Sequence, residues 1–388
     1  MSEMADNNFS GLNVLEFAQG VAGPYCGMLL AQHGATVTKI EPVKGGDWSR
    51  QLGRSYGDFS ANSVVVNRGK RSVALDLKAP DAEDIVRRLA AEADVIIENY
   101  RPGVIDRLGF GYEAVKAYNE KVIYASLTGF GSVGPNKALP ATDTVMQGYC
   151  GLMSINRGSD GVPRRLDMLA VDTVAGLYLF QSIAGALYKQ LRYGVGSRIE
   201  TNLLHCALAF QHAKIVEFAL SGSTSEAAGS PVGTFRTADG FLSLNARRDP
   251  DFRRLCEALG NTWFSDERFA SPAARLEHNA ELSDLLASII QKKSTAEWTA
   301  ALSEADVLHA PVKTYQDLLK DEQVNALGVI GWDELDGLGR HPVVSVPGLA
   351  TSGERGAPRI GEHNEAVLSD LGYPRSKIDD LRESGAIA

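Results

Sequence analysis

Short apolar runs alternate with longer stretches in which apolar residues recur every three or four positions, throughout the first half of the chain. The short runs are typical of buried strands, and the longer stretches of amphipathic helices. Helices are expected between the strands, over residues 22–34 and 81–91 and again before residue 122. This alternation predicts an α/β fold with a parallel sheet, opening with a βαβ unit. The predicted strands are residues 13–17, 36–40, 71–77, 94–98 and 122–127.

The pattern changes after residue 220, where residues 221–225 and 229–231 are small, polar and turn-rich. Such a stretch is typical of a linker. Beyond it, residues 240–244 predict a strand and residues 251–259 and 280–291 predict amphipathic helices, so we expect a second, smaller domain. The segments 343–347 and 354–359 are predicted to be extended and to lie on the surface.

Composition narrows the class of protein. A chain of 388 residues with 44% hydrophobic content is long enough for two domains. The net charge of -9 argues against a nucleic-acid binder, which needs a basic surface. No apolar run is long enough to span a bilayer, and residues 1–8 show no signal-peptide pattern. We therefore expect a soluble, cytoplasmic protein with neither a nucleic-acid nor a membrane partner.

Cysteines and histidines predict no metal site. The four cysteines are too scattered for a metal cluster and too few for a disulfide framework, so we interpret them as interior residues. None of the seven histidines pairs with another at metal-ligand spacing. His205 and His212 lie seven residues apart in an apolar stretch, a spacing that would put them on one face of a continuous helix, and we interpret them as core or interface residues.

Asp172 is a lone carboxylate within the apolar, helix-like run 168–180. Burying an ionised carboxylate without partners costs several kcal/mol or shifts its pKa, so a carboxylate in this setting is a candidate nucleophile. A position near a helix N-cap, where it would accept from free N–H groups, is the alternative interpretation. Gly176, one turn later, would allow close approach of another backbone.

Asn99, Arg101, Gly129 and Gly131 fall just beyond the ends of predicted strands. Ligands of open α/β sheets bind at this edge. The two glycines can present backbone N–H groups to an anionic transition state, although turns that need positive φ explain them equally well.

Distinctive sequence blocks follow one another along nearly the whole chain, at residues 15–17, 22–24, 30–42, 45–47, 67–72, 98–103, 107–109, 126–131, 134–135, 310–312 and 358–363. In this order they resemble family III CoA-transferases, which include formyl-CoA transferase and carnitine-related CoA-transferases. The resemblance implies a large Rossmann-like domain from both chain ends (1–220, with a return at 328–388) and a smaller inserted α+β domain (221–327). It also implies a homodimer whose subunits interlock like rings.

The resemblance implies that CoA moves from an acyl-CoA donor to a small carboxylic acid, with CoA as substrate and product. Asp172 matches the catalytic aspartate, which attacks the thioester to form a mixed anhydride and is then attacked by the CoA thiolate. Lys78 and Arg107 would face phosphate, whereas Asn99 and Tyr100 would hydrogen-bond and stack. The implied CoA-binding residues are Gly20, Val21, Ala22, Leu75, Lys78, Asn99, Tyr100, Arg107 and Leu108.

Two departures from the family bear on the substrate. Val21 stands where formyl-CoA transferase has an active-site glutamine, while Gln19 lies two positions earlier, and residues 244–249 lack that enzyme's glycine-rich loop. We therefore expect a dicarboxylate such as succinate rather than formate or oxalate. The residues expected to contact the acid are Gln19 and one of two arginine pairs, Arg164 with Arg165 or Arg247 with Arg248.

Three alternatives remain at this point. A related α-methylacyl-CoA racemase needs a histidine base before an aspartate, and this chain has Thr142 before Asp143. A dinucleotide-dependent oxidoreductase would need the G-x-G-x-x-G spacing, which the turn at residues 17–23 lacks. A non-catalytic acyl-CoA-binding protein would not need Asp172.

Overall fold

The structure, a computed structural model, describes residues 8–158, 160–222, 229–349 and 356–388. Residues 1–7, residues 223–225 of the predicted linker and residues 354–355 of the predicted extended tail lie outside the described residues. The chain folds into two compact units. One comprises Met1–Leu220 with Val329–Ala388, and the other comprises Ser221–Gly328.

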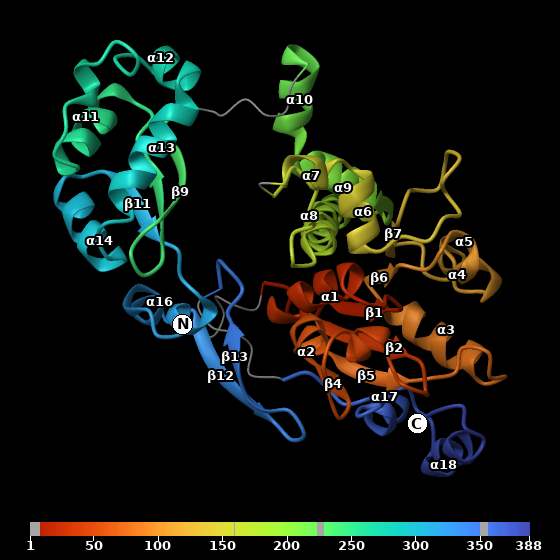
Figure 1. The fold of residues 1–388 in the computed structure, drawn as a ribbon. Helices are drawn as coiled ribbons and strands as arrows, with labels where there is room; N and C mark the ends of the chain where they lie inside the picture. The colour runs from red at the N-terminus through yellow and green to blue at the C-terminus, as the bar shows by residue number, and fades with distance from the viewer. Residues whose placement is uncertain (1–7, 159, 223–228, 350–355) are drawn as a thin grey trace. The chain divides into compact units, whose positions relative to one another are not determined.

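The larger unit contains a six-stranded sheet in the order β5-β2-β1-β6-β7-β8 (Figure 1). Every neighbouring pair is parallel, as the alternation of strands and helices requires. The predicted α/β fold with a parallel sheet is confirmed. The strands are β1 (Asn13–Glu16), β2 (Thr36–Glu41), β5 (Arg71–Ala74), β6 (Val95–Glu98), β7 (Ile123–Thr128) and β8 (Ser197–Asn202).

Both faces of the sheet are buried, which explains the continuous apolar runs in its central strands. Val14, Val95 and Ile97 belong to the hydrophobic core on one face. Leu15 and Ile96 belong to the core on the other face, as the two-residue period of a strand predicts. Helices on the first face are α1 (Ala22–Gln32), α6 (Asp143–Tyr149), α8 (Ala170–Tyr193) and α9 (Leu203–Phe210). Helices on the second face are α3 (Ala82–Glu92), α5 (Tyr112–Lys116), α17 (Asn364–Asp370) and α18 (Arg375–Glu383).

The carboxyl-terminal segment returns to the β5 edge of the sheet. Asn364 Oδ1 accepts a hydrogen bond from Ala74 N at 2.8 Å, and Ile387 forms an antiparallel bridge with Leu75. An antiparallel hairpin precedes this return, so part of the predicted extended segment 343–347 lies in a strand. The remaining elements of this unit are η1 (Trp48–Gln51), β3 (Ser55–Tyr56), β4 (Phe59–Ser60), α2 (Ala61–Asn67), α4 (Val104–Arg107), α7 (Leu152–Ile155), α10 (His212–Ser221), β12 (Ile330–Leu335) and β13 (Gly339–Val344).

The smaller unit packs helices on a three-stranded antiparallel sheet of order β11-β10-β9. Leu242 and Leu244 of β10 point into its core, together with the buried indole of Trp298. Its strands are β9 (Val232–Arg236), β10 (Phe241–Asn245) and β11 (Leu308–Pro311). Its helices are α11 (Asp249–Ala258), η2 (Trp263–Ser265), α12 (Pro272–Glu277), α13 (Asn279–Ile290), α14 (Thr295–Glu304), α15 (Tyr315–Leu318) and α16 (Glu322–Leu327).

Helix α8 is the central helix of the larger unit. By length and composition alone it could cross a membrane, as could the bent pair α9–α10, but half of the α8 window is buried inside the protein. Val171, Leu179 and Ile183 of this helix belong to the core, whereas Leu177 and Leu191 are 45% and 85% exposed. Gly176 lets α1 approach closely, because a Cβ at this position would lie 2.6 Å from the carbonyl oxygen of Ala22.

Replacing Gly176 by alanine should lower the free energy of unfolding by about 1–3 kcal/mol, since backbone atoms of α1 must move. Gly185→Ala in the same helix is the matched control, because its Cβ would have no neighbour within 4 Å. Alanine's higher helix propensity should stabilise that variant by up to about 1 kcal/mol. Urea unfolding of both variants measures the difference, and equal effects would contradict the close packing of α1 on α8.

Candidate active site

Asp172 is the third residue of α8, and its side chain reaches a cavity of about 430 Å³ at the carboxyl edge of the sheet. The residue is only 7% exposed. In the part of the chain that the structure describes, no hydrogen bond to its carboxylate is present. The site therefore holds a buried carboxylate with space for a reacting group in front of it.

The first turn of α8 is capped from another helix. Its own N-cap residue, Leu169, makes no side-chain hydrogen bond. Asp143 of α6 instead accepts hydrogen bonds through Oδ2 from Val171 N at 2.7 Å and from Asp172 N at 3.2 Å. In the sequence, Asp143 drew notice only as the residue after Thr142, which stands where the racemase has its histidine base. Because this contact spans 28–29 residues, no local sequence pattern could reveal it.

Burial raises the pKa of Asp172 to about 7, and the nearby negative charge of Asp143 contributes in the same direction. The positive end of the α8 dipole opposes this shift. Near neutral pH the carboxyl group is therefore divided between its protonated and ionised forms. Only the ionised form is a nucleophile.

Loops that follow β1, β6 and β7 form the walls of the cavity. Gln19 and Asn99 join two of these loops through a reciprocal pair: Gln19 N donates to Asn99 Oδ1 at 2.9 Å, and Asn99 Nδ2 donates to Gln19 O at 2.7 Å. The cavity-lining residues are Gln19, Val21, Ala22, Trp48, Asn99, Tyr100, Arg101, Pro102, Leu127, Thr128, Gly129, Lys137, Leu139, Pro140, Ala141, Thr142, Asp172 and Leu203.

A buried ion cluster fixes the loop after β1. Lys39 Nζ lies 2.9 Å from Glu16 Oε1 and 2.8 Å from Asp47 Oδ2, and all three side chains are fully buried. Asp47 Oδ1 accepts a hydrogen bond from Gly20 N at 2.7 Å. Gly20 has a φ of +84°, and a Cβ there would lie 1.9 Å from the ring of Trp48, so only glycine fits this turn.

A second cavity, of about 770 Å³, lies along the loops after β2 and β5. Tyr100 lines both cavities, so it marks where they adjoin. The walls of the second cavity combine apolar side chains with two lysines, Lys44 and Lys78, and two carboxylates, Glu41 and Asp76. The residues lining it are Ile40, Glu41, Pro42, Val43, Lys44, Leu75, Asp76, Leu77, Lys78, Tyr100, Val104, Leu108, Ser384 and Gly385.

The nine residues expected to bind CoA divide between these places. Val21, Ala22, Asn99 and Tyr100 line the cavity with Asp172. Leu75, Lys78, Tyr100 and Leu108 line the second cavity. Gly20 supports the first wall through its bond to Asp47. Arg107 precedes Leu108 at the end of α4 and lines neither cavity.

Of the arginines expected to bind the acid, Arg164 and Arg165 belong to the same unit as the Asp172 cavity and do not line it. Arg164 pairs with Asp160 at 3.0 Å and Arg165 with Asp167 at 2.6 Å, both on an exposed loop. Gln19, the other residue expected to contact the acid, does line the cavity.

Arg247 and Arg248 belong to the smaller unit, where Arg248 pairs with Asp251 at 2.6 Å. The cationic side chains that line the Asp172 cavity are instead Arg101 and Lys137. The sequence places Arg101 just beyond a predicted strand, at this edge, but indicates no role for it. No motif or strand end in the sequence points to Lys137.

The two candidate glycines differ. Gly129 lines the Asp172 cavity. Gly131 has a φ of +92°, and its N–H donates to Thr128 Oγ1 at 3.0 Å, so that donor is already occupied.

The placement of the histidines bears on the expected helix face and on metal binding. His205 and His212 lie on different helices, α9 and α10, which are bent by 66° to each other, so the expected shared helix face is wrong. Among the described residues, no group of three or more His, Cys, Asp or Glu side chains is arranged to hold a metal ion.

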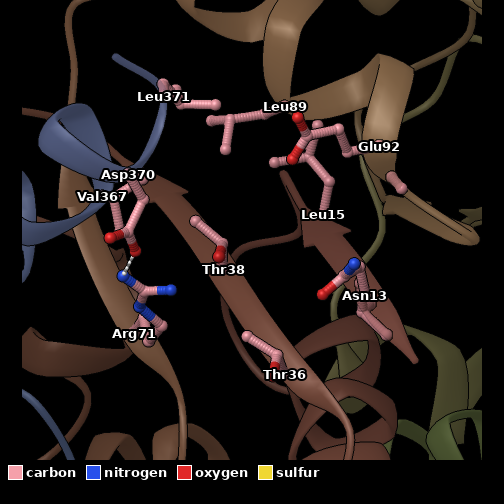
Figure 2. A pocket seen from close by; sticks show the side chains of 12 residues that line it. Asn13, Leu15, Thr36, Thr38, Arg71, Leu89, Glu92, Val367, Asp370 and Leu371 are labelled. Carbon is pink, nitrogen blue, oxygen red and sulfur yellow. Dashed lines mark hydrogen bonds and ion pairs between the residues drawn. The ribbon is translucent and has the colours of Figure 1, made fainter. Parts of the chain in front are cut away.

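A smaller cavity of about 150 Å³ lies at the opposite edge of the sheet (Figure 2). Asn13, Thr36 and Arg71 mark this edge because they begin β1, β2 and β5. Arg71 is already paired with Asp370 of α17 at 2.7 Å. Glu92 also lines this cavity, and its negative charge would repel an anionic ligand.

A buried carboxylate at the carboxyl edge of a parallel sheet, beside a long cavity with lysines, is typical of an α/β enzyme for an extended anionic substrate. The model of CoA-transferase family III matches residues 9–364. The chain therefore belongs to CoA-transferase family III, and it is an enzyme that transfers CoA. The resemblance seen in the sequence is confirmed.

Individual relatives agree with this family. The chain is 34% identical over 386 residues to the succinate–glutarate CoA-transferase of Agrobacterium fabrum, covering 93% of this chain and 95% of that protein. It is 32% identical to the succinyl-CoA–D-citramalate CoA-transferase of Chloroflexus aurantiacus, covering 93% of each. A crystal structure of a CAIB/BAIF family protein from Brucella suis has a TM-score of 0.82 and 31% identity, covering 93% of this chain and 98% of that one.

The raised pKa of Asp172 predicts a pH-dependent stability difference between the wild type and Asp172→Asn. Between pH 4 and pH 7 the unfolded state ionises this group while the folded state keeps its proton, so the wild type loses stability as pH rises. The advantage of Asp172→Asn should therefore grow by about 4 kcal/mol from pH 4 to pH 8. Urea unfolding across this range measures it, and a constant difference would show that Asp172 ionises normally.

Proposed function

We propose that this enzyme moves CoA between an acyl-CoA and a small dicarboxylic acid through covalent intermediates on Asp172. The observation that carries the proposal is the buried, unpaired carboxylate of Asp172, which faces a cavity. At Tyr100 this cavity adjoins the second, larger cavity. The activities in the names of the relatives, with succinate, glutarate and citramalate as acids, support this substrate class.

The chemistry begins when the Asp172 carboxylate attacks the thioester carbonyl. The C–S bond breaks, CoA leaves as a thiolate, and an aspartyl mixed anhydride forms. The thiolate then attacks the aspartyl carbonyl and releases the donor acid, which leaves CoA as a thioester on Asp172. The acceptor carboxylate reverses these steps, so the energy of the thioester is conserved without ATP.

The two cavities suit different parts of an acyl-CoA. In the second cavity, Leu75 and Leu108 would make apolar contacts, and Lys44 and Lys78 would supply positive charge for phosphates. The pantetheine arm would pass Tyr100 and place its thioester before Asp172. Arg101 and Lys137 then remain for the second carboxylate of the acid. This assignment replaces the arginine pairs expected from the sequence.

The racemase and the non-catalytic alternatives find less support. The described residues that line the Asp172 cavity include no histidine, and Thr142 stands where the racemase needs its base. A protein that only binds acyl-CoA would gain nothing from burying an unpaired carboxylate.

We also propose that the enzyme is a homodimer. Helix α10 has no buried residue, and its Phe218 and Leu220 are 54% and 84% exposed. Phe210, which ends α9 just before it, is 55% exposed. A second copy of the chain, covering these side chains, would explain an apolar helix that packs on no core of its own. The interlocked arrangement and the cytoplasmic location stay predictions. Sedimentation as a monomer at micromolar concentration would contradict the dimer.

Trapping with hydroxylamine tests the covalent mechanism. Succinyl-CoA and hydroxylamine should convert Asp172 to a hydroxamate, which peptide mass spectrometry detects, because the activated aspartyl carbonyl reacts with strong nucleophiles. Asp172→Asn should give no hydroxamate while still binding CoA. Turnover without any modification of Asp172 would exclude the covalent route.

The charges of Arg101 and Lys137 should distinguish dicarboxylates from monocarboxylates. Lys137→Met and Arg101→Met should each raise KM for succinate roughly tenfold or more, since a charge-assisted hydrogen bond contributes about 1.5–3 kcal/mol. KM for butyrate should change little. Arg164→Met, which removes an exposed arginine paired with Asp160, is the control and should leave both values unchanged. A selective rise in KM for the acyl-CoA would instead assign these cations to CoA.

A further inference from the structure

The segment that leads into α8 is held by two side chains of α6, Asp143 and Gln147, which lie one turn apart. Gln147 Oε1 accepts from Leu166 N at 2.8 Å, and its Nε2 donates to Met168 O at 3.1 Å. The same Nε2 donates to Asp143 Oδ1 at 2.6 Å. Gln147 is fully buried and Asp143 is 2% exposed, so water does not compete for these bonds.

Asp143 uses its other oxygen for α8. Oδ2 accepts from the backbone N–H groups of Val171 and Asp172, which an ordinary N-cap side chain at Leu169 would have satisfied. The nucleophile's own backbone is thus tied to a neighbouring helix. A carboxylate does this with greater strength than a neutral acceptor, because a charged acceptor roughly doubles the strength of a hydrogen bond.

We propose that Asp143, oriented by Gln147, is a positioning residue that caps α8 from outside and holds the Asp172 carboxylate in line with the thioester. The proposal rests on Asp172 being the nucleophile. It assigns a role to a residue that never touches the substrate, since Asp143 does not line the cavity.

The charge of Asp143 has a second effect, because it makes Asp172 harder to ionise. Among the described residues, Asp143 is the charged group that adds to burial in raising the pKa of Asp172. The cationic side chains across the cavity are Arg101 and Lys137, with the phenol of Tyr100 beside them. Further titratable groups on elements packed against α8 are Tyr25 and Cys26 of α1, Tyr149 of α6, Tyr124 of β7, Arg198 and Glu200 of β8, and His205 and Cys206 of α9.

Single-turnover kinetics across a range of pH test the proposal in three variants. Asp143→Asn keeps an acceptor oxygen and removes the charge, whereas Asp143→Ala removes both. Asp94→Asn is the matched control, because Asp94 also accepts from a backbone N–H group, that of Asn13 at 2.9 Å, but at the opposite edge of the sheet. The readouts are the rate at which the hydroxamate forms at Asp172 and the Tm of each variant.

Asp143→Ala should slow adduct formation about a hundredfold at pH values where Asp172 is ionised in every variant, because a misplaced nucleophile loses its alignment. Since this variant also lacks the charge of Asp143, the acid limb of its rate should move to lower pH as in Asp143→Asn. Asp143→Asn should slow adduct formation less and shift the acid limb of the rate to lower pH by about half a unit or more. Asp94→Asn should change neither. If Asp143→Asn forms the adduct at the wild-type rate and loses that rate at the same acidic pH as the wild type, the proposal is wrong. It is also wrong if the variant loses both Tm and rate while the pH at which the rate falls off stays unchanged.

Failure of the underlying mechanism looks different. If the wild type forms no hydroxamate at Asp172 during turnover, Asp172 is not the nucleophile and both proposals are wrong. If the wild type forms it and Asp143→Asn behaves like the control, only the positioning role is wrong.

Discussion

The buried ion cluster at the carboxyl ends of β1 and β2 is the constraint on which the site depends. Lys39 and Lys70 balance Glu16 and Asp47, and all four side chains are fully buried. Removing any one partner would leave an uncompensated charge in the core, which costs several kcal/mol. Because Asp47 also accepts from Gly20 N, the same cluster fixes the cavity wall that faces Asp172.

The supporting charges and the carboxylate that we propose as the nucleophile have opposite environments. Lys39, flanked by three carboxylates, has a pKa that burial lowers but that Asp47, Glu16 and Glu41 raise by more. Asp172 receives no such partner, and both burial and Asp143 raise its pKa to about 7. The paired charges anchor the loop after β1 through the hydrogen bond from Gly20 N to Asp47, which disfavours a rearrangement that would solvate Asp172.

Much of the fold and part of the site could be predicted from the sequence. The apolar alternation indicated the parallel sheet, because the two-residue period of Val14 and Leu15 is a local property of a strand. Asp172 stood out because its neighbours are apolar, and Gly176 because close packing excludes a Cβ. Asn99 could be placed at the ligand edge since it directly follows β6.

The architecture, the family and the residue expected to react could therefore be predicted from the chain alone. The cap that Asp143 places on α8, and the approach of Arg101 and Lys137 rather than Arg164 and Arg165 to the Asp172 cavity, became visible only in the folded structure. These contacts join residues from separate loops and helices. They depend on how α6 and α8 pack over the sheet, and packing between distant segments leaves no local periodicity in the chain.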